Sequence, residues 1–255
     1  MCLVLFGVNV SESFPFILAA NRDEFYQRPT AAMNFWQENP AILAGKDLEH
    51  GGTWFGLHTR GRFAALTNYR DLSMVKPSAP SRGDIIPKFL ESNSSIPDFL
   101  EQLKTKSSHY NGFNLLAGDS HTLYWFSNQN QKITRVTPGI HGLSNHLMDT
   151  PWPKVTAGKT ALARAMDANT LDPATLFDLL SDTSRPADAS LPDTGVGADW
   201  ERILSPLFIQ SPSYGTRSSI VMGITPQGQI QVTERTHFPD RTTPYTDRNF
   251  SLFPR

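Results

Sequence analysis

The order in which strand-like and helical segments follow each other is the feature that most restricts the fold of this chain. Short apolar runs with the composition of β-strands lie at both ends, and helical spacing of apolar residues occurs in two groups between them. This order differs from the strict strand–helix alternation of a doubly wound parallel sheet, and it predicts two packed sheets covered by helices. We therefore expect an α+β protein with one domain over residues 1–255.

The individual elements are predicted from local pattern. Residues 3–10 and 14–20 predict a β-hairpin, and a second hairpin is expected around the Arg60-Gly61 turn. Residues 28–40 and 181–198 are rich in proline and polar residues and predict loops. The remaining predictions are helices over residues 84–92, 97–106, 152–166 and 174–180, and strands over residues 113–117, 122–126, 133–136, 218–225 and 229–236.

The only cysteine, Cys2, stands one residue from the start, at the head of an apolar run. Cysteine is small enough for Met1 to be removed, and the freed α-amine would have a reference pKa of about 7.7–8.0. Such an amine can accept the thiol proton near neutral pH, so Cys2 would carry its own base. The alternative, from its position alone, is a small apolar residue that begins a buried strand.

Composition excludes several classes of function. The net charge is −1, and Lys and Arg are spread along the chain, so we expect no nucleic-acid partner. No apolar run approaches the roughly 18–20 residues of a membrane span. One cysteine excludes an intramolecular disulfide, and the first basic residue is Arg22, so the apolar start has no charged leader region. We expect a cytoplasmic protein.

A nucleophile at the start of a chain needs polar partners, and candidates lie at the predicted strand ends. Asn21 and Asp23 follow the second strand, and Asn68 ends the second hairpin. Asn145 ends a Gly-Leu-Ser-Asn run, and Arg217 precedes the strand over residues 218–225. Each of the asparagines and the aspartate is also typical of a turn when it is considered alone.

The tetrapeptide Asn21-Arg22-Asp23-Glu24, in a chain that begins Met-Cys, resembles the NRDE family, also called the transport-and-Golgi-organisation protein two family. The resemblance covers essentially the whole chain. It rests on an ordered set of motifs, which also includes Gly-Gly-Thr-Trp-Phe-Gly at residues 51–56, Thr67-Asn68, Ser81-Arg82-Gly83, Leu143-Ser144-Asn145 and Gly-Thr-Arg-Ser-Ser at residues 215–219.

That family is distantly similar to the cysteine N-terminal-nucleophile hydrolases, which are related to bile-salt hydrolase and penicillin acylase and have a four-layer αββα sandwich. The resemblance implies this fold here, with Cys2 as the nucleophile and Asp23 near its amine. It implies Asn68 and Asn145 as groups that stabilise the oxyanion, and Arg217 as the match to a late active-site arginine.

Residues beside these motifs are expected to contact the ligand. They are Asn21, Arg22, Glu24, Trp54 and Tyr69, the two aromatic residues as walls of a pocket for a flat or apolar group. The seven histidines are scattered without the i,i+4 spacing of a helical metal site, so no metal is expected.

Two functions stay open. In the first, the protein is an enzyme: Cys2 attacks an amide or thioester of a small molecule, and no cofactor is required. In the second, it is a carrier, because the NRDE family has been linked to intracellular haem trafficking and to acyl-CoA or lipid handling. Cys2 or a histidine would then be an axial ligand of haem in the same pocket. The sequence has no Cys-x-x-Cys-His motif, which excludes covalent haem attachment of the c type.

Overall fold

The hairpins at the two ends of the chain join one antiparallel sheet in the computed structural model, which describes residues 2–166, 172–238 and 242–254. The strands of this sheet follow the order β10 (Gly139–Leu143), β1 (Cys2–Val8), β2 (Phe16–Phe25), β11 (Tyr214–Ile224), β12 (Ile230–His237) and β13 (Tyr245–Leu252). The amino-terminal strands β1 and β2 therefore lie inside the sheet, with hydrogen-bonded neighbours on both edges.

The middle of the chain forms a second antiparallel sheet. Its strands follow the order β3 (Thr30–Phe35), β4 (Ile42–Asp47), β5 (Phe55–His58), β6 (Phe63–Asn68), β7 (Phe113–Gly118), β8 (Leu123–Ser127) and β9 (Ile133–Arg135). Strands β5 and β6 form the hairpin predicted around Arg60-Gly61, and Gly61 adopts a φ of 89°, which glycine tolerates without a steric cost. The prediction of this hairpin, with Asn68 at its far end, is confirmed.

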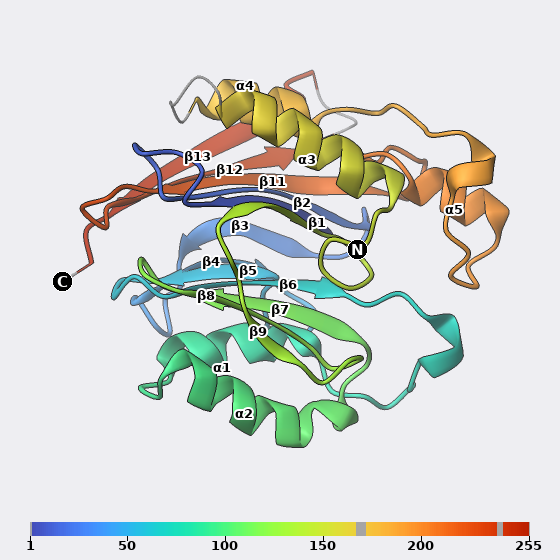
Figure 1. The fold of residues 1–255 in the computed structure, drawn as a ribbon. Coiled ribbons are helices and arrows are strands. Elements are labelled where there is room, and N and C mark those ends of the chain that lie inside the picture. Colours follow the sequence, from blue (N-terminus) through green and yellow to red (C-terminus); the bar gives the residue numbers. More distant parts are fainter. Residues whose placement is uncertain (1, 167–171, 239–241, 255) are drawn as a thin grey trace.

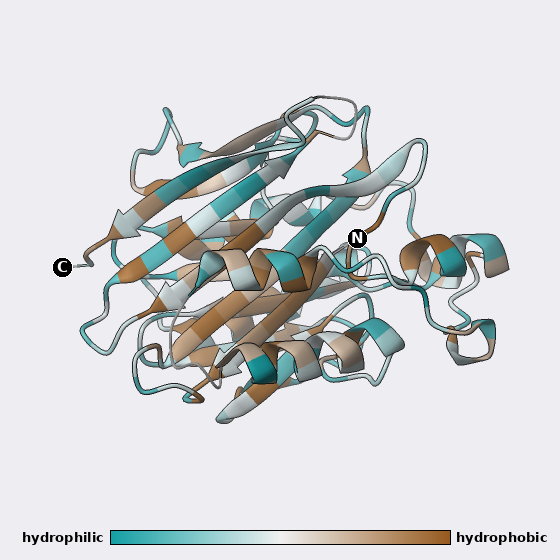
Figure 2. Cartoon of the chain, turned by 90° about the horizontal axis from the view of Figure 1, so that it is seen from above, coloured by the Kyte–Doolittle hydropathy of each residue, from teal (hydrophilic) through white to brown (hydrophobic). Residues whose placement is uncertain are grey.

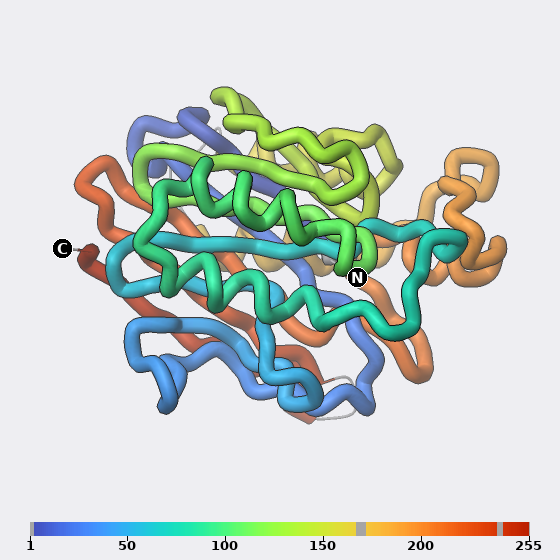
Figure 3. Tube along the Cα trace, turned by 90° about the horizontal axis from the view of Figure 1, so that it is seen from below, coloured from blue at the N-terminus to red at the C-terminus, as the bar shows by residue number. Residues whose placement is uncertain are grey.

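Helices cover the outer face of each sheet, which gives four layers (Figure 1). The second sheet is covered by α1 (Ile85–Glu91) and α2 (Ile96–Lys106), which Figure 3 shows from below. The first sheet is covered by α3 (Pro153–Met166) and α4 (Pro173–Leu180), and α5 (Ala198–Leu204) lies at one end of the molecule. Short 3-10 helices occur at η1 (Leu72–Met74), η2 (Arg82–Asp84), η3 (Ser107–His109) and η4 (Asp188–Ser190). The expected αββα sandwich is confirmed.

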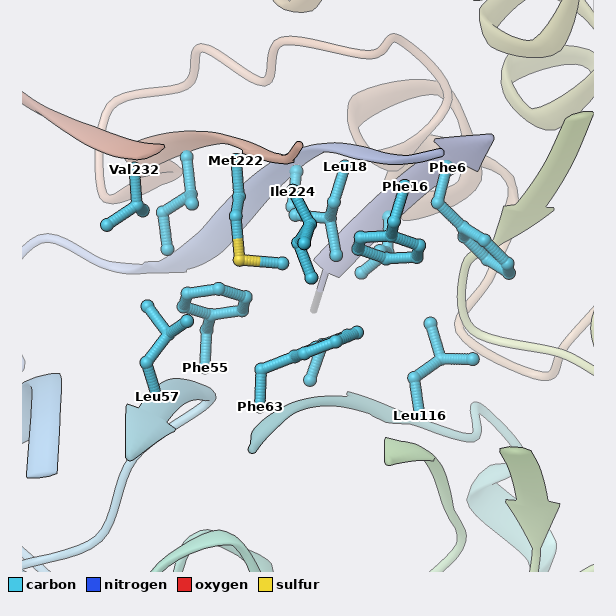
Figure 4. Close-up of a cluster of buried hydrophobic side chains, with 14 of the residues drawn as sticks. Phe6, Phe16, Leu18, Phe55, Leu57, Phe63, Leu116, Met222, Ile224 and Val232 are labelled. Carbon is cyan, nitrogen blue, oxygen red and sulfur yellow. The ribbon is translucent and has the colours of Figure 1, made fainter. Parts of the chain in front are cut away.

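Strand periodicity explains this layering, because successive side chains of a strand point to opposite faces of the sheet. Along β2, Phe16 and Leu18 pack between the two sheets, while Ile17 and Ala19 pack against α3 and α4. Figure 4 shows the side chains between the sheets interdigitating, and Figure 2 shows hydrophilic and hydrophobic residues mixed along the strands. Burial of both faces makes β1 and β2 nearly continuous apolar runs up to the polar residues described below.

Three sequence predictions about local structure were wrong. Residues 28–40 were expected to form a loop, but they contain β3. This strand lies at the edge of its sheet, its register shifts between Ala31 and Asn34, and half of its residues are only partly buried, so it lacks a clear alternation. The elements β4, β13 and α5 were not predicted at all, and β13 is an edge strand with mostly exposed residues. Strand β2 also extends five residues beyond the predicted end at residue 20.

We expect Phe63→Ala to destabilise the protein by about 3–5 kcal/mol, because it removes a ring that packs between the sheets at 4.8 Å from that of Phe16. Chemical denaturation followed by circular dichroism measures this change. Phe253→Ala is the matched control, since that ring is 69% exposed and its loss should cost under about 0.5 kcal/mol. Equal costs for the two variants would contradict the proposed position of the core.

Candidate active site

The polar tetrapeptide at residues 21–24 lies within strand β2 and not after it. The register pairs Arg22 with Cys2 of β1 on one side and with Ser218 of β11 on the other. Asp23 is paired with Thr216, and the register shifts between Thr216 and Ser218. The first strand of the chain therefore begins beside this tetrapeptide, so residues distant in sequence meet at one end of the sheet.

Asp23 is buried and held by two residues of β11. The Thr216 hydroxyl donates to Asp23 Oδ1 at 2.7 Å, and the Tyr214 hydroxyl donates to the Asp23 carbonyl at 3.0 Å. Burial raises the pKa of the Asp23 carboxyl above its ordinary value, an effect that the nearby charge of Lys154 and the Thr216 hydrogen bond partly oppose. Asp23 also lines a cavity, described below, so its carboxyl is positioned beside a space that can hold a ligand.

Lys154 is a buried residue near Asp23 that sequence reasoning missed. It lies in the first turn of α3, is buried, and donates from Nζ to the Leu204 carbonyl at 2.9 Å. A lysine on the buried side of a helix is rare unless it is paired. The only signal in the sequence was this charge at a position between Trp152 and Val155, where an apolar residue is expected.

Asn21 holds the central strand to the helical layer. Its Nδ2 donates to the carbonyls of Leu180 and Leu207, each at 2.8 Å, and its Oδ1 accepts from the Ser219 hydroxyl at 2.6 Å. Asn21 does not line the cavity that Asp23 lines. These three bonds use both hydrogens of the Asn21 amide nitrogen and one lone pair of its oxygen. A contact between Asn21 and a ligand stays a prediction.

Arg22 faces the other sheet, and its guanidinium lies over the Trp54 ring at 4.1 Å from the centroid. Arg22 is 5% exposed. The carboxylate that forms an ion pair with it is Glu24, at 3.9 Å, which is too long for a hydrogen bond. The charge of Arg22 also acts on the carboxyls of Asp23 and Glu234. Trp54 in turn packs closely on Gly45, since a Cβ at that position would lie 2.5 Å from the indole ring.

These residues line a cavity of about 320 Å³ between the end of β2 and the segments that enter and leave the second sheet. Predicted site residues among its walls are Arg22, Asp23, Glu24, Trp54 and Asn68, and other walls come from Arg28, Asp47, His50, Thr53, Ser81 and Arg82. The lining is mostly polar and charged, with Trp54 and Leu66 as its larger apolar groups. The cavity is therefore suited to a small polar molecule.

Two motifs from the sequence meet on one wall of this cavity. Thr53 donates its backbone N–H to the Gly83 carbonyl at 3.0 Å, which joins the segment at residues 51–54 to η2. A Cβ on Gly52 would lie 2.4 Å from the carbonyl carbon of Gly83, so the two backbones approach more closely than any other residue at position 52 would allow. The Ser81 hydroxyl accepts from the Gly83 N–H at 3.3 Å and fixes the turn that carries Arg82.

A second charged cluster closes the cavity on the side of β3 and β4. Arg28 forms ion pairs with Asp47 at 2.8 Å and Glu49 at 3.1 Å, and Glu24 lies 3.9 Å from it. Hydrogen bonds from Arg28 and from the N–H groups of residues 49 and 50 lower the pKa of Asp47, against the effect of its burial. The charge of Arg28 is thus largely neutralised within this cluster.

The two predicted oxyanion asparagines lie on neighbouring segments. Asn145 is fully buried, its Nδ2 donates to the Asn68 carbonyl at 2.9 Å, and its own carbonyl accepts from the Arg70 N–H at 2.8 Å. Asn68 lines the cavity, whereas Asn145 does not. An amide nitrogen carries two hydrogens, so Asn145 keeps one that this bond does not use.

Tyr69 makes a relay with His146 immediately beyond these asparagines. The Thr150 hydroxyl donates to the Leu147 carbonyl, so it accepts from Nδ1 of His146 at 2.8 Å. Nε2 of His146 is then the acceptor for the Tyr69 hydroxyl, also at 2.8 Å. Burial lowers the pKa of His146, which keeps the imidazole neutral in this tautomer. Tyr69 lines a smaller cavity of about 130 Å³, which shares Arg82 and Asn111 with the first.

Arg217 occupies the irregular position of β11 and lies outside the cavity wall. Its Nη1 donates to the carbonyls of Phe25, Tyr26 and Arg28 at 2.8–3.1 Å. These bonds hold the turn after β2, so the position supports a structural contribution, and a contact with substrate stays a prediction.

A buried carboxyl that was not predicted from the sequence, Glu234, lies between the sheets. Its Oε2 accepts from the Met33 N–H, and the residue is 1% exposed. Burial raises the pKa of Glu234 to about 7, although the Met33 N–H and the charges of Arg248 and Arg22 act in the opposite direction.

The described residues offer neither a candidate metal site nor a candidate membrane-spanning helix. They contain no group of three or more His, Cys, Asp and Glu side chains arranged to hold a metal ion. Within the same residues, no helix combines the length and the apolar character that a membrane crossing requires.

Comparison with known proteins identifies the relatives of this chain. The family model "Transport and Golgi organisation 2" matches residues 1–239. The transport and Golgi organisation 2 homologue of Mus musculus is 33% identical over 99% of both chains, and that of Homo sapiens is 34% identical over 96% of this chain and 99% of its own. The homologue of Bos taurus is 36% identical over 92% of both.

Solved structures with a similar fold belong to a hydrolase. A mutant conjugated bile acid hydrolase from Clostridium perfringens has a TM-score of 0.51 at 11% identity, covering 100% of this chain and 98% of the other. Another variant of that enzyme has a TM-score of 0.54 at 10% identity, covering 98% and 92%. At this identity the likeness shows the fold, which is that of the N-terminal-nucleophile hydrolases.

We expect Glu234→Gln to flatten the pH dependence of stability. The folded-state pKa of about 7 lies above the ordinary 4.5, so the contribution of the neutral carboxyl is complete below about pH 4.5 and is lost as the pH rises through 7. The free energy of unfolding of the wild type should fall by about 3 kcal/mol more than that of the variant over this range. Urea denaturation of both proteins at several pH values measures the difference, and parallel pH profiles would contradict it.

Proposed function

The chain belongs to the Transport and Golgi organisation 2 family, and we propose that its charged cavity is the active site of a cysteine N-terminal-nucleophile hydrolase or acyl transferase. The substrate class is a small amide or thioester. The single observation that carries the proposal is the strand register, which pairs Cys2 at the start of β1 with Arg22 of β2. Arg22 and the buried Asp23 that follows it both line the cavity, and so does Asn68.

The proposed chemistry requires the removal of Met1, after which the α-amine of Cys2 takes the proton from the thiol. The sulfur attacks the carbonyl carbon, and the carbonyl oxygen becomes an oxyanion that accepts hydrogen bonds from the amides of Asn68 and Asn145. The protonated amine then gives its proton to the departing amine or thiolate, leaving an acyl thioester on Cys2. Water, or another nucleophile, releases the acyl group in the second step.

Asp23 and Lys154 would control the charge around this amine. Asp23 is held by Thr216 and does not need to move in order to orient an ammonium group. The charge of Lys154 acts on the Asp23 carboxyl, and in this proposal it also disfavours the protonated amine, because like charges disfavour a second cation. In this proposal Lys154 keeps the α-amine of Cys2 available as a base, and Asp23 keeps that amine oriented.

The fold similarity to the conjugated bile acid hydrolase is consistent with this proposal, since the same scaffold occurs in a protein that is named as a hydrolase. Fold similarity alone is a weak argument for activity, because one fold serves many functions. The specific support comes from the residues that this chain places at its own cavity.

The carrier alternative, in which the same cavity holds haem or an acyl-CoA or lipid, stays a prediction. The observation in its favour is His50, an imidazole at the cavity wall that is able to ligate iron. The charged lining favours a smaller polar ligand. Titration with haem tests the alternative: a shifted absorption band that is lost in His50→Ala supports the carrier, and an unshifted band removes it.

We expect Asn68→Ala to lower kcat on a cleaved amide or thioester by about 10²–10³-fold with little change in KM, because it removes an oxyanion donor. A panel of amides and thioesters, read by amine or thiol release, supplies the substrate. Asn93→Ala is the matched control, since Asn93 lies at the opposite end of the β5–β6 hairpin, where it contacts Arg60.

Two further measurements make this test decisive. Intact mass establishes whether Met1 is removed from the purified protein, and Cys2→Ala should abolish turnover completely. Normal turnover in Cys2→Ala, or no turnover of any panel member by protein that lacks Met1, would overturn the proposed reaction.

A further inference from the structure

Two buried nitrogens of residues that line the cavity have no hydrogen-bond acceptor in the described part of the chain, and the proposed hydrolysis does not supply one. Nη1 of Arg22 and Nε1 of Trp54 are shielded from solvent, and neither has a hydrogen-bond acceptor among the described residues. Both residues line the cavity. Buried donors in native proteins nearly always have a partner, and a buried charge without one is costly.

Arg22 forms no hydrogen bond with the carboxylate that pairs with it. Glu24 is too distant for a hydrogen bond with it, and its carboxylate also lies 3.9 Å from Arg28. The Trp54 ring stabilises the guanidinium through its face, but a π-face accepts charge more weakly than an anion does. Arg22 is therefore a cation that the protein stacks on an indole ring while one of its guanidinium nitrogens, Nη1, keeps an unused hydrogen-bond donor.

The segment at η2 adds a second cation to the lining. Arg82 lines the cavity from η2, and its Nη1 donates to the Gly112 carbonyl at 2.9 Å, which fixes the guanidinium. The contact between Gly52 and Gly83 holds the segment that carries Trp54 against the segment that carries Arg82. The Gly-Gly-Thr-Trp and Ser-Arg-Gly motifs thus place an indole N–H and a positive charge on the same wall.

The cavity carries charged groups of both signs. Arg28 is paired with both Asp47 and Glu49, so its positive charge is fully used within a cluster that carries one excess negative charge on the side of β3 and β4. Arg22 and Arg82 also line the cavity, with Glu24 in ion-pair range of Arg22. The unused donors of Arg22 and Trp54, one of them charged, are complementary to one anionic group.

We propose that this cavity is an anion-binding subsite, in which a carboxylate or phosphate group of the ligand accepts hydrogen bonds from Arg22 and Trp54 and lies beside Arg82. The inference rests on the proposed function where it names the substrate: an amide or thioester that also carries an anionic group. The binding itself does not require Cys2, since none of the three side chains depends on the thiol.

Binding of two small probes tests the subsite. Inorganic phosphate and N-acetylglycine, which supplies a carboxylate, are each titrated into the full-length protein by calorimetry. We expect saturable binding that Arg22→Met weakens by about 10–100-fold, the effect of losing hydrogen bonds to a charged group. Arg60→Met is the matched control, because Arg60 is exposed on the turn at the opposite end of the β5–β6 hairpin, and its affinity should equal that of the wild type.

A second variant keeps the test valid if Arg22→Met does not fold. Trp54→Phe retains an aromatic face for Arg22 but removes the indole N–H, and it should weaken binding by about three- to tenfold. Binding of phosphate alone, carboxylate alone or both supports the subsite and identifies which group it accepts. Failure of the wild type to bind either probe, or equal affinities for Arg60→Met and the folded variants, overturns it.

The same titration separates this inference from the proposed reaction. Cys2→Ala should bind both probes as tightly as the wild type, whether or not the protein hydrolyses any amide. Anion binding by a protein that shows no turnover would overturn the proposed hydrolase reaction and support the anion-binding subsite. Turnover without anion binding would support the reaction and overturn the subsite.

Discussion

The hydrogen-bonded position of β2 between β1 and β11 is the constraint on which the site depends. A strand paired on both edges cannot shift its register without breaking two ladders, and a shift of one residue would exchange the faces of all its side chains. Asn21 therefore faces the helical layer, where it ties β2 to the ends of two other segments, while Arg22 faces the second sheet. One tetrapeptide supplies both the anchor of the sheet and the charge of the cavity.

The sequence predicted the parts of this molecule that have a strong local period. The hairpins, the helices of both outer layers and the four-layer sandwich followed from apolar spacing and from the family resemblance. Edge strands such as β3 and β13 were missed, because their exposed residues follow no apolar period. The extent of β2 was misjudged because polar residues usually end a strand, whereas here Asn21 and Asp23 find buried partners inside the sheet.

The site was predictable only in part, for a related reason. Asp23, Asn68 and Asn145 were named through resemblance to a family, and no spacing in this chain alone links them. Lys154 and Glu234 were missed, because a single charged residue within an apolar pattern gives no information about which partner it will meet. Their effects arise from tertiary burial, which raises the pKa of Glu234 and places Lys154 beside Asp23.

The Tyr69–His146–Thr150 relay has a consequence for the direction of its hydrogen bonds. At neutral pH the tyrosine is the donor, because only one imidazole nitrogen carries a hydrogen and Thr150 accepts it. Once acid protonates His146, both ring nitrogens become donors, and the phenol oxygen must accept instead. The phenolic hydrogen of Tyr69 then rotates away from the imidazole and must find another acceptor. Tyr69 directly follows Asn68 in the chain. Acidification would reorient a dipole next to the cavity without moving the backbone.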